Sequence, residues 1–225
     1  MSTYILNIET ATTNCSVSLS DNGETIMIKE DNDKSYSHAE RLHVYIESVL
    51  KEAHISSVDL SAIAISKGPG SYTGLRIGVS AAKGLCFAMD KPLISVATLQ
   101  ALAWQVTIKE GCIVAMLDAR RMEVYSAIFD ANHSQIRNTQ AQILDEASFS
   151  EYLEKGKVYF IGNGVEKTKA LIEHPNAVFI DGKLPSANEM SNLAFTKYQK
   201  SDTEDVAYFE PYYLKDFIAL KPKKA

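Results

Sequence analysis

Polar residues that could bind a ligand such as a phosphate group lie at three separated turns of this chain. The stretch Glu9 to Cys15 (ETATTNC) follows a short apolar run and sets a carboxylate beside three threonine hydroxyls. Hydroxyl groups and the backbone N–H groups of glycine-rich turns are common phosphate ligands. The candidate ligand site therefore contains Glu9, Thr10, Asp118, Arg120, Gly162, Asn163 and Gly164. The structural alternatives are a threonine-rich turn that satisfies its own backbone and an ion-paired hairpin turn.

The sequence offers little for metal binding or nucleophilic catalysis. His38 and His43 are five residues apart, which turns their imidazoles about 140° away from each other on a helix, so they do not share a metal ion easily. The three cysteines match no disulfide, zinc or nucleophile pattern. The Gly68-Pro69-Gly70 loop lacks the Lys-Ser/Thr ending of a P-loop. We expect no catalytic residue, no metal site and no cofactor of the chain's own.

The least ordinary stretch runs from Lys67 to Met89, KGPGSYTGLRIGVSAAKGLCFAM. A Gly-Pro-Gly turn leads into a helix-length segment, for which Ser71 or Thr73 is a natural N-cap. Small residues recur every four positions and so share one helical face: Gly74, Gly78 and Ala82. Each glycine costs roughly 1 kcal/mol of helix propensity relative to alanine. The pattern predicts that another backbone comes very close to this face.

The hydrophobic pattern predicts an α/β protein made of two similar halves. The expected strands of the first half are Tyr4–Glu9, Cys15–Ser20, Glu24–Lys29, Ala62–Ser66 and Pro92–Val96, and its helices are Ser37–His54, Tyr72–Met89 and Ala97–Lys109. Those of the second are Cys112–Leu117, Met122–Phe129, Gln135–Ile143, Val158–Ile161 and Val178–Ile180, with helices Glu146–Lys155, Val165–Glu173 and Asn188–Lys200. Each half reads βββαβαβα, which predicts units 1–110 and 111–225. Two tandem ribonuclease-H-like units of this kind resemble the actin and sugar-kinase ATPase superfamily.

Charge and composition exclude several classes of protein. The net charge of −5 argues against autonomous RNA binding, which needs clustered Lys and Arg. The basic residues near the end, Lys215, Lys221, Lys223 and Lys224, are expected to form a solvated tail. No secretory signal and no run of about 18 apolar residues is present, so we expect a cytoplasmic protein without a membrane span.

Several motifs together resemble the TsaB (YeaZ) family of tRNA threonylcarbamoyladenosine biosynthesis partner proteins. They are ILNIETATTNCSVSL, HAERL, KGPGSYTGLRIGVSAAKGL, VAMLDARRMEVYSAIF, IGNGV and EPYYLK, in the expected order over nearly the whole chain. The glycine-rich string is the most specific of them. One departure is Glu9, where the family usually has aspartate.

The resemblance implies a non-catalytic scaffold that activates TsaD, the enzyme that transfers threonylcarbamoyl to the adenosine beside the tRNA anticodon. It further implies a heterodimer with TsaD through the first two helices, a third protein, TsaE, and a possible homodimer through the same surface. The implied interface contains His38, Arg41, Leu42, Tyr45, Tyr72, Thr73, Gly74, Arg76, Ile77, Gly78, Ala81, Ala82 and Leu85. Whether a nucleotide lies at that interface stays open. The alternative function is a nucleotide-binding enzyme of the kinase or ATPase type that acts between the two halves.

Overall fold

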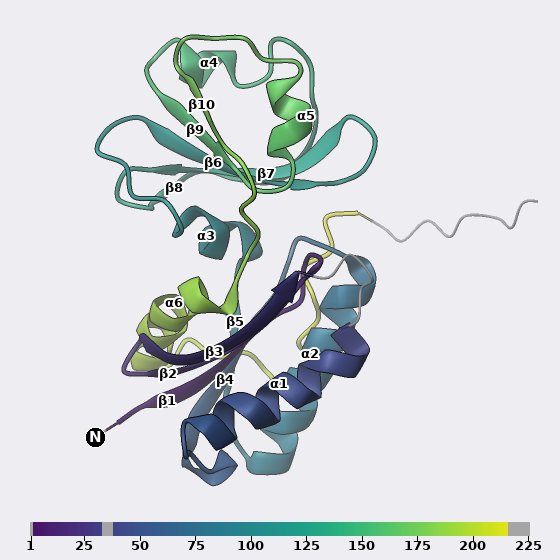
Figure 1. Ribbon diagram of the computed structural model, residues 1–225, viewed down its shortest axis with the longest axis vertical. Helices are drawn as coiled ribbons and strands as arrows, with labels where there is room; N and C mark the ends of the chain where they lie inside the picture. Colours follow the sequence, from purple (N-terminus) through teal and green to yellow (C-terminus); the bar gives the residue numbers. More distant parts are fainter. Residues whose placement is uncertain (1, 33–37, 216–225) are drawn as a thin grey trace, which may run out of the picture.

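The computed structural model describes residues 2–32 and 38–215 and contains two five-stranded sheets (Figure 1). The first has the strand order β3-β2-β1-β4-β5, and the second has β10-β9-β6-β7-β8. In each sheet three antiparallel strands come first in the chain and two parallel strands follow. The predicted fold class, two tandem units of one topology, is confirmed. The predicted first residue of the helix Ser37–His54 and the lysines at 221, 223 and 224 lie outside the described residues.

The first sheet is covered on one face by two long helices. Its strands are β1 (Tyr4–Glu9), β2 (Asn14–Asp21), β3 (Glu24–Asn32), β4 (Leu60–Ser66) and β5 (Leu93–Val96), and a short 3-10 helix, η1 (Ser57–Asp59), precedes β4. The helices α1 (His38–Glu52) and α2 (Tyr72–Met89) lie side by side on this face (Figure 1). Apolar residues of both helices, such as Leu42 and Val79, share one core cluster with Val17 and Leu19 of β2.

The second sheet carries much shorter helices. Its strands are β6 (Cys112–Asp118), β7 (Glu123–Asp130), β8 (Gln135–Ile143), β9 (Val158–Ile161) and β10 (Ala177–Ile180). The helices α4 (Ser150–Leu153) and α5 (Val165–Lys169) are about one turn long, although the sequence pattern predicted helices over 146–155 and 165–173. The pattern overestimated them because apolar residues beside a helix, such as Phe149 and Ile172, also enter the core.

Two helices cross between the units. The helix α6 (Ala187–Gln199) follows the second sheet in sequence but packs against the free face of the first sheet, where Met190 and Ala194 share a core cluster with Ile5 and Ile94. The helix α3 (Thr98–Ala103) packs its leucines against the second sheet. A division at residue 110 therefore describes the sheets but not the helices. Figure 1 shows α3 and α6 as a middle layer between the two sheets.

The contact between β2 and α6 also explains a misleading pattern. β2 alternates apolar and polar residues, which predicts a strand with one solvated face, yet seven of its eight residues are buried. The serines face α6 instead of water: the hydroxyl of Ser18 donates to the carbonyl oxygen of Ala187 at 2.8 Å, and the backbone N–H of Ala187 donates to the Ser16 hydroxyl at 3.0 Å. The hydroxyl groups on this face of β2 thus find their hydrogen-bond partners at the N-terminus of α6.

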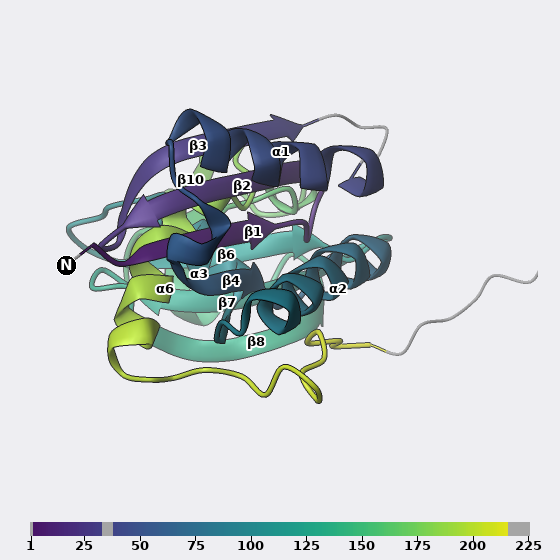
Figure 2. The ribbon, with the colours of Figure 1, turned by 90° about the horizontal axis from the view of Figure 1, so that it is seen from below.

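A segment that we call the closing segment, residues 204–215, returns from the end of α6 along the first unit. Figure 2 shows it passing from α6 toward α2. The N–H of Glu204 donates to the Leu93 carbonyl at 2.8 Å, and the Lys83 ammonium donates to the Phe209 carbonyl at 2.9 Å. At its end, Lys215 pairs with Glu123 of the second unit. Lys215 is therefore not a free part of a solvated tail.

Within residues 2–32 and 38–215, no helix has the length and apolar content needed to cross a membrane. In the same part of the chain, no three His, Cys, Asp or Glu side chains gather as metal ligands would.

Candidate partner interface and ligand site

The small-residue face of α2 packs against the turn between β1 and β2 of the same chain. A β-carbon on Gly74 would overlap the carbonyl oxygen of Thr10, and one on Gly78 would overlap the Thr10 hydroxyl. That hydroxyl donates a hydrogen bond of 2.8 Å to the carbonyl of Gly74. The close backbone approach predicted from the sequence exists, but the neighbour is this chain's own first turn. Gly74 and Gly78 are therefore not available to a partner.

The loop before α2 is fitted to its surroundings in the same way. Gly68 has a φ of +109°, which only glycine adopts easily, and a β-carbon on Gly70 would overlap the carbonyl of Ala11. The N–H of Ser71 donates to the same carbonyl at 2.6 Å, and the Ser71 hydroxyl accepts from the N–H of Gly74 at 3.3 Å. Ser71 is thus the N-cap, one of the two predicted residues. The glycine-rich string closes over the first turn and leaves no phosphate cradle.

Glu9 is enclosed by this arrangement. Its side chain is fully buried, and Oε1 accepts a 2.5 Å hydrogen bond from the N–H of Ala11, while Oε2 has no partner among the described residues. Burial raises the pKa of the Glu9 carboxyl to about 7, although hydrogen bonds from Ser66 and from the backbone of Ala11 and Thr10 act in the opposite direction. Thr10 is fully buried as well. Neither residue presents a surface to a ligand.

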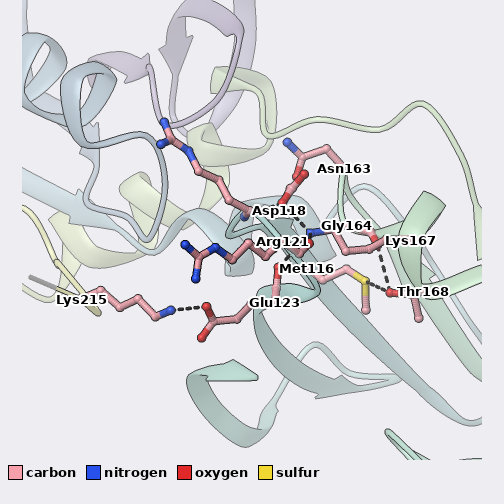
Figure 3. A network of polar contacts seen from close by, with 10 residues as sticks. Met116, Asp118, Arg121, Glu123, Asn163, Gly164, Lys167, Thr168 and Lys215 are labelled. Carbon is pink, nitrogen blue, oxygen red and sulfur yellow. Dashed lines mark hydrogen bonds and ion pairs between the residues drawn. The ribbon is translucent and has the colours of Figure 1, made fainter. Parts of the chain in front are cut away.

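The other candidate ligand residues lie on the second unit. The N–H of Asp118 donates to Asn163 Oδ1 at 2.8 Å, and the Asp118 carboxylate accepts from the Lys167 ammonium at 2.6 Å (Figure 3). The loop glycines serve packing: a β-carbon on Gly162 would overlap the Met116 carbonyl, and one on Gly164 would press on Val124 and Met116. Arg120 is exposed. Among the contacts of the described residues, none joins this group to Glu9 or Thr10.

Two open cavities, of about 580 and 630 Å³, are lined by other residues. The first is lined by Thr3, Asn22, Pro92, Phe195, Tyr198, Gln199, Ser201 and Thr203. The second is polar and lies between β2, β3 and the residues that lead into α6; Asn14, Glu30, Gln105, Lys183, Asn188 and Glu189 are part of its lining. None of the seven residues of the candidate ligand site lines either cavity.

The thirteen residues of the implied partner interface divide into three groups by exposure. Five are buried within this chain: His38, Leu42, Gly74, Gly78 and Ala82. Six are half-buried: Arg41, Tyr45, Tyr72, Ile77, Ala81 and Leu85. Thr73 and Arg76 are exposed. The buried group holds the first unit together; for example, the His38 ring makes a 2.6 Å hydrogen bond with the Thr12 carbonyl.

Sequence reasoning overlooked several exposed residues on the same two helices. Phe87 of α2 is 86% exposed and Val44 of α1 is 59% exposed. Gly84 and Ala88 are also exposed, and a β-carbon on Gly84 would meet no atom within 4 Å. Phe87 lies on the polar strip of α2, eleven residues after Arg76, which is close to three full turns. An aromatic residue in a polar strip was the signal that could have identified it.

We call a set of half-buried and exposed residues on α1 and α2 the helix face. It consists of Arg41, Val44, Tyr45, Tyr72, Thr73, Arg76, Ile77, Ala81, Gly84, Leu85, Phe87 and Ala88. At one end of it the Tyr72 ring lies 4.9 Å from the Tyr213 ring, and the Arg76 guanidinium lies 5.5 Å from the Tyr72 ring centre. The closing segment thus supports the helix face.

Comparisons with known proteins agree with this geometry. The family model described as TsaD, tRNA N6-adenosine threonylcarbamoyltransferase, matches residues 32–222. The chain is 32% identical to the tRNA threonylcarbamoyladenosine biosynthesis protein TsaB of Escherichia coli (strain K12), over 96% of both chains. The chain belongs to the TsaB family. The TsaB protein of Haemophilus influenzae is 28% identical over 96% of this chain and 95% of its own.

Two solved structures of YeaZ-type proteins share the fold of nearly the whole chain. The structure of YeaZ from Pseudomonas aeruginosa covers 94% of this chain and is itself fully covered, with a TM-score of 0.80 and 25% identity. A second structure, of a protein from the same organism with similarity to YeaZ, has a TM-score of 0.84 and 24% identity. The resemblance of the sequence motifs to the TsaB family is therefore confirmed.

Proposed function

We propose that this protein is a non-catalytic subunit that activates a TsaD enzyme during threonylcarbamoylation of the adenosine beside the tRNA anticodon. Its place in the TsaB family supports a role in this tRNA modification. This role implies that the protein acts in the cytoplasm. The observation that carries the proposal is the filled first turn. The resemblance to the actin and sugar-kinase superfamily implies a glycine-rich, phosphate-binding hairpin at this turn in the nucleotide-binding members, whereas here Gly70, Gly74 and Gly78 bring α2 onto Thr10 and Ala11.

We further propose that TsaD docks on the helix face. Phe87 is a large apolar side chain left almost entirely in water, and exposed aromatic residues of this kind are common anchors of protein interfaces. Gly84 and Ala88 lie beside it and allow a neighbouring helix to approach closely. The chain pairs with itself through this face when TsaD is absent, TsaE joins the assembly with TsaD, and no cofactor of the chain's own is needed.

The docking proposal is tested by Phe87→Glu, with Ile143→Glu as the matched control. Both side chains are exposed, and Ile143 lies on β8, far from α1 and α2 in the chain and on the other sheet. A central interface residue contributes about 2 kcal/mol or more, so Phe87→Glu should weaken binding of TsaD about 30-fold. Ile143→Glu should leave the affinity unchanged. Equal affinity of the two variants in a calorimetric titration would contradict the proposal.

The same variants test self-association. Sedimentation of the pure chain should show a dimer that Phe87→Glu converts to a monomer, and addition of TsaD should replace the homodimer by a heterodimer. A dimer that survives Phe87→Glu and persists beside bound TsaD would place self-association on another surface.

The polar cavity of about 630 Å³ favours one alternative, a nucleotide-binding enzyme of the kinase or ATPase type. Its lining brings together amides and carboxylates of β2, β3, Gln105 and α6, beside residues 182–184 of the loop that leads into α6. Calorimetry with ATP and magnesium on the isolated chain separates the two functions. The scaffold proposal expects no binding heat; low-micromolar binding that is lost in Asn188→Ala would support the enzyme instead.

A further inference from the structure

The turn between β6 and β7 presents two adjacent arginines in an unusual backbone conformation. Arg120 has a φ of 70° and Arg121 a φ of 52°, a region that residues with a β-carbon seldom occupy. Both side chains are exposed. Figure 3 shows the Arg121 guanidinium pointing away from the neighbouring polar network. Consecutive strained residues on the surface, both of them cations, point to a use outside the fold itself.

The carboxylates beside the turn are already occupied. Asp118 pairs with Lys167 and accepts the N–H of Arg120 at 2.6 Å, and Glu123 pairs with Lys215. Within residues 2–32 and 38–215, neither arginine side chain has a hydrogen bond or an ion pair. This small region thus contains four cationic side chains, those of the two arginines, Lys167 and Lys215, and two carboxylates, those of Asp118 and Glu123. The excess is positive although the net charge of the chain is −5. The turn is a local positive surface.

The turn is held rigidly enough to act as a binding element. The Lys167 ammonium, whose side chain is only 15% exposed, donates to the Arg121 carbonyl at 2.7 Å and to the Glu123 carbonyl at 3.0 Å. The N–H of Ala119 donates to Glu123 at 3.0 Å, which closes the hairpin. These bonds fix the backbone of the turn, so the points at which the two arginine side chains leave it are set before binding, and only the side chains themselves remain to be ordered.

We infer that this arginine turn contacts the phosphate backbone of the tRNA substrate, an inference that rests on the proposed function. The turn lines neither described cavity, so it suits an extended polyanion better than a small enclosed ligand. Guanidinium groups bind phosphate oxygens with two parallel hydrogen bonds. Each phosphate that is neutralised releases counterions, so binding depends on salt. The overall negative charge makes this a contact of the assembled complex and not of the isolated chain.

The test measures tRNA affinity of the full chain bound to TsaD, at several salt concentrations. Replacing Arg120 and Arg121 by alanine should weaken tRNA binding about tenfold and reduce the slope of log affinity against log salt by about 1.5, as expected for two lost phosphate contacts. The double variant Arg120→Lys, Arg121→Lys keeps both charges and should retain most of the affinity. Glycine at both positions accepts the positive φ values without a β-carbon, so this variant should remove both guanidiniums and keep the fold, and its thermal unfolding checks this.

A charge-matched control uses Lys109→Glu with Lys200→Glu, two exposed lysines elsewhere, against Arg120→Glu with Arg121→Glu. Only the arginine pair should impair tRNA binding. Unchanged tRNA affinity and salt slope in an intact complex would overturn this inference alone. Weakened TsaD binding with unchanged tRNA affinity would also overturn it, since the turn would then bind an acidic protein surface. If the wild-type chain does not bind TsaD, the proposed function itself is wrong.

Discussion

The two units differ most at the turn that follows their first strand. β1 ends at Glu9 and β6 ends at Asp118, so each unit places an acidic residue at the same topological position. Glu9 is completely buried beneath the start of α2. Asp118 is exposed and bound by Lys167. One turn has become part of a core and the other remains a surface.

The covering helix accounts for this difference. In the first unit, α2 has 18 residues, and its glycines let it lie directly on the turn. In the second unit, α5 has five residues and contacts its turn through the long side chain of Lys167. Duplication of a topology therefore does not duplicate a site, because the site depends on local packing. The following predictions test this contrast, from the largest expected effect to the smallest.

Gly74→Leu should unfold or severely destabilise the chain. The new side chain would collide with the Thr10 carbonyl, which belongs to a buried strand end and cannot move aside, so we expect a loss of about 3 kcal/mol or more. Gly84→Leu, on the open side of the same helix, should not destabilise the fold. Urea unfolding of the two variants measures the difference, and equal stabilities would disprove the close packing of α2 on the first turn.

Glu9→Gln should change how stability depends on pH. The pKa of Glu9 is raised from 4.5 to about 7 in the folded protein, so between these values the unfolded chain has lost a proton that the folded chain keeps. Stability of the wild type should therefore fall as pH rises through this range, by about 3 kcal/mol in total. The glutamine variant lacks this component. The free energy of unfolding of the wild type and of Glu9→Gln is measured from pH 4.5 to 7.5. If the two curves run parallel, the Glu9 carboxyl does not have the raised pKa expected from its burial.

Lys167→Met should destabilise the second unit by about 2 kcal/mol. The substitution keeps much of the side-chain volume but leaves Asp118 and the carbonyls of Arg121 and Glu123 without their shared donor. Lys169→Met is the control, since Lys169 is well exposed and pairs only with Asp181. Thermal unfolding should separate the two variants; equal melting temperatures would mean that the open turn does not depend on Lys167.

Arg120→Gly should raise the free energy of unfolding slightly, by up to about 1 kcal/mol. Glycine adopts the positive φ of this position without the steric cost of a β-carbon. Arg76→Gly, at an exposed position within α2, should instead cost about 1 kcal/mol of helix propensity. The pair of variants shows whether the open turn stores backbone strain, and a loss of stability in Arg120→Gly would contradict it.

Much of the fold was predictable from the sequence because local periodicity determines it. The strands, α1, α2 and the cap at Ser71 follow from patterns within a few residues. The helices α3, α4 and α5 were predicted too long, since apolar residues next to a helix are as periodic as those within it. The packing of α6 on the first sheet had no local signal, as its partners on β1 and β2 lie about 170 residues earlier.

The site was predicted less well, for a related reason. The glycine spacing showed that α2 has a face requiring close contact but could not show which segment meets that face. The structure identifies Thr10, so the glycines expected at a partner interface belong to the interior. Likewise, the sequence grouped Glu9 with Asp118 as turn residues without revealing that one is buried and the other exposed. Burial depends on long-range packing that a single sequence does not contain.

The closing segment has a consequence for synthesis of the protein. The helix face is formed by residues before position 89. However, the Lys83 side chain of α2 donates a hydrogen bond to the Phe209 carbonyl, and the Tyr72 ring packs on the Tyr213 ring. A ribosome must therefore produce nearly the whole chain before α2 acquires its final support. Chains that end before residue 209 would lack both of these contacts, and their helix face would therefore be unsupported.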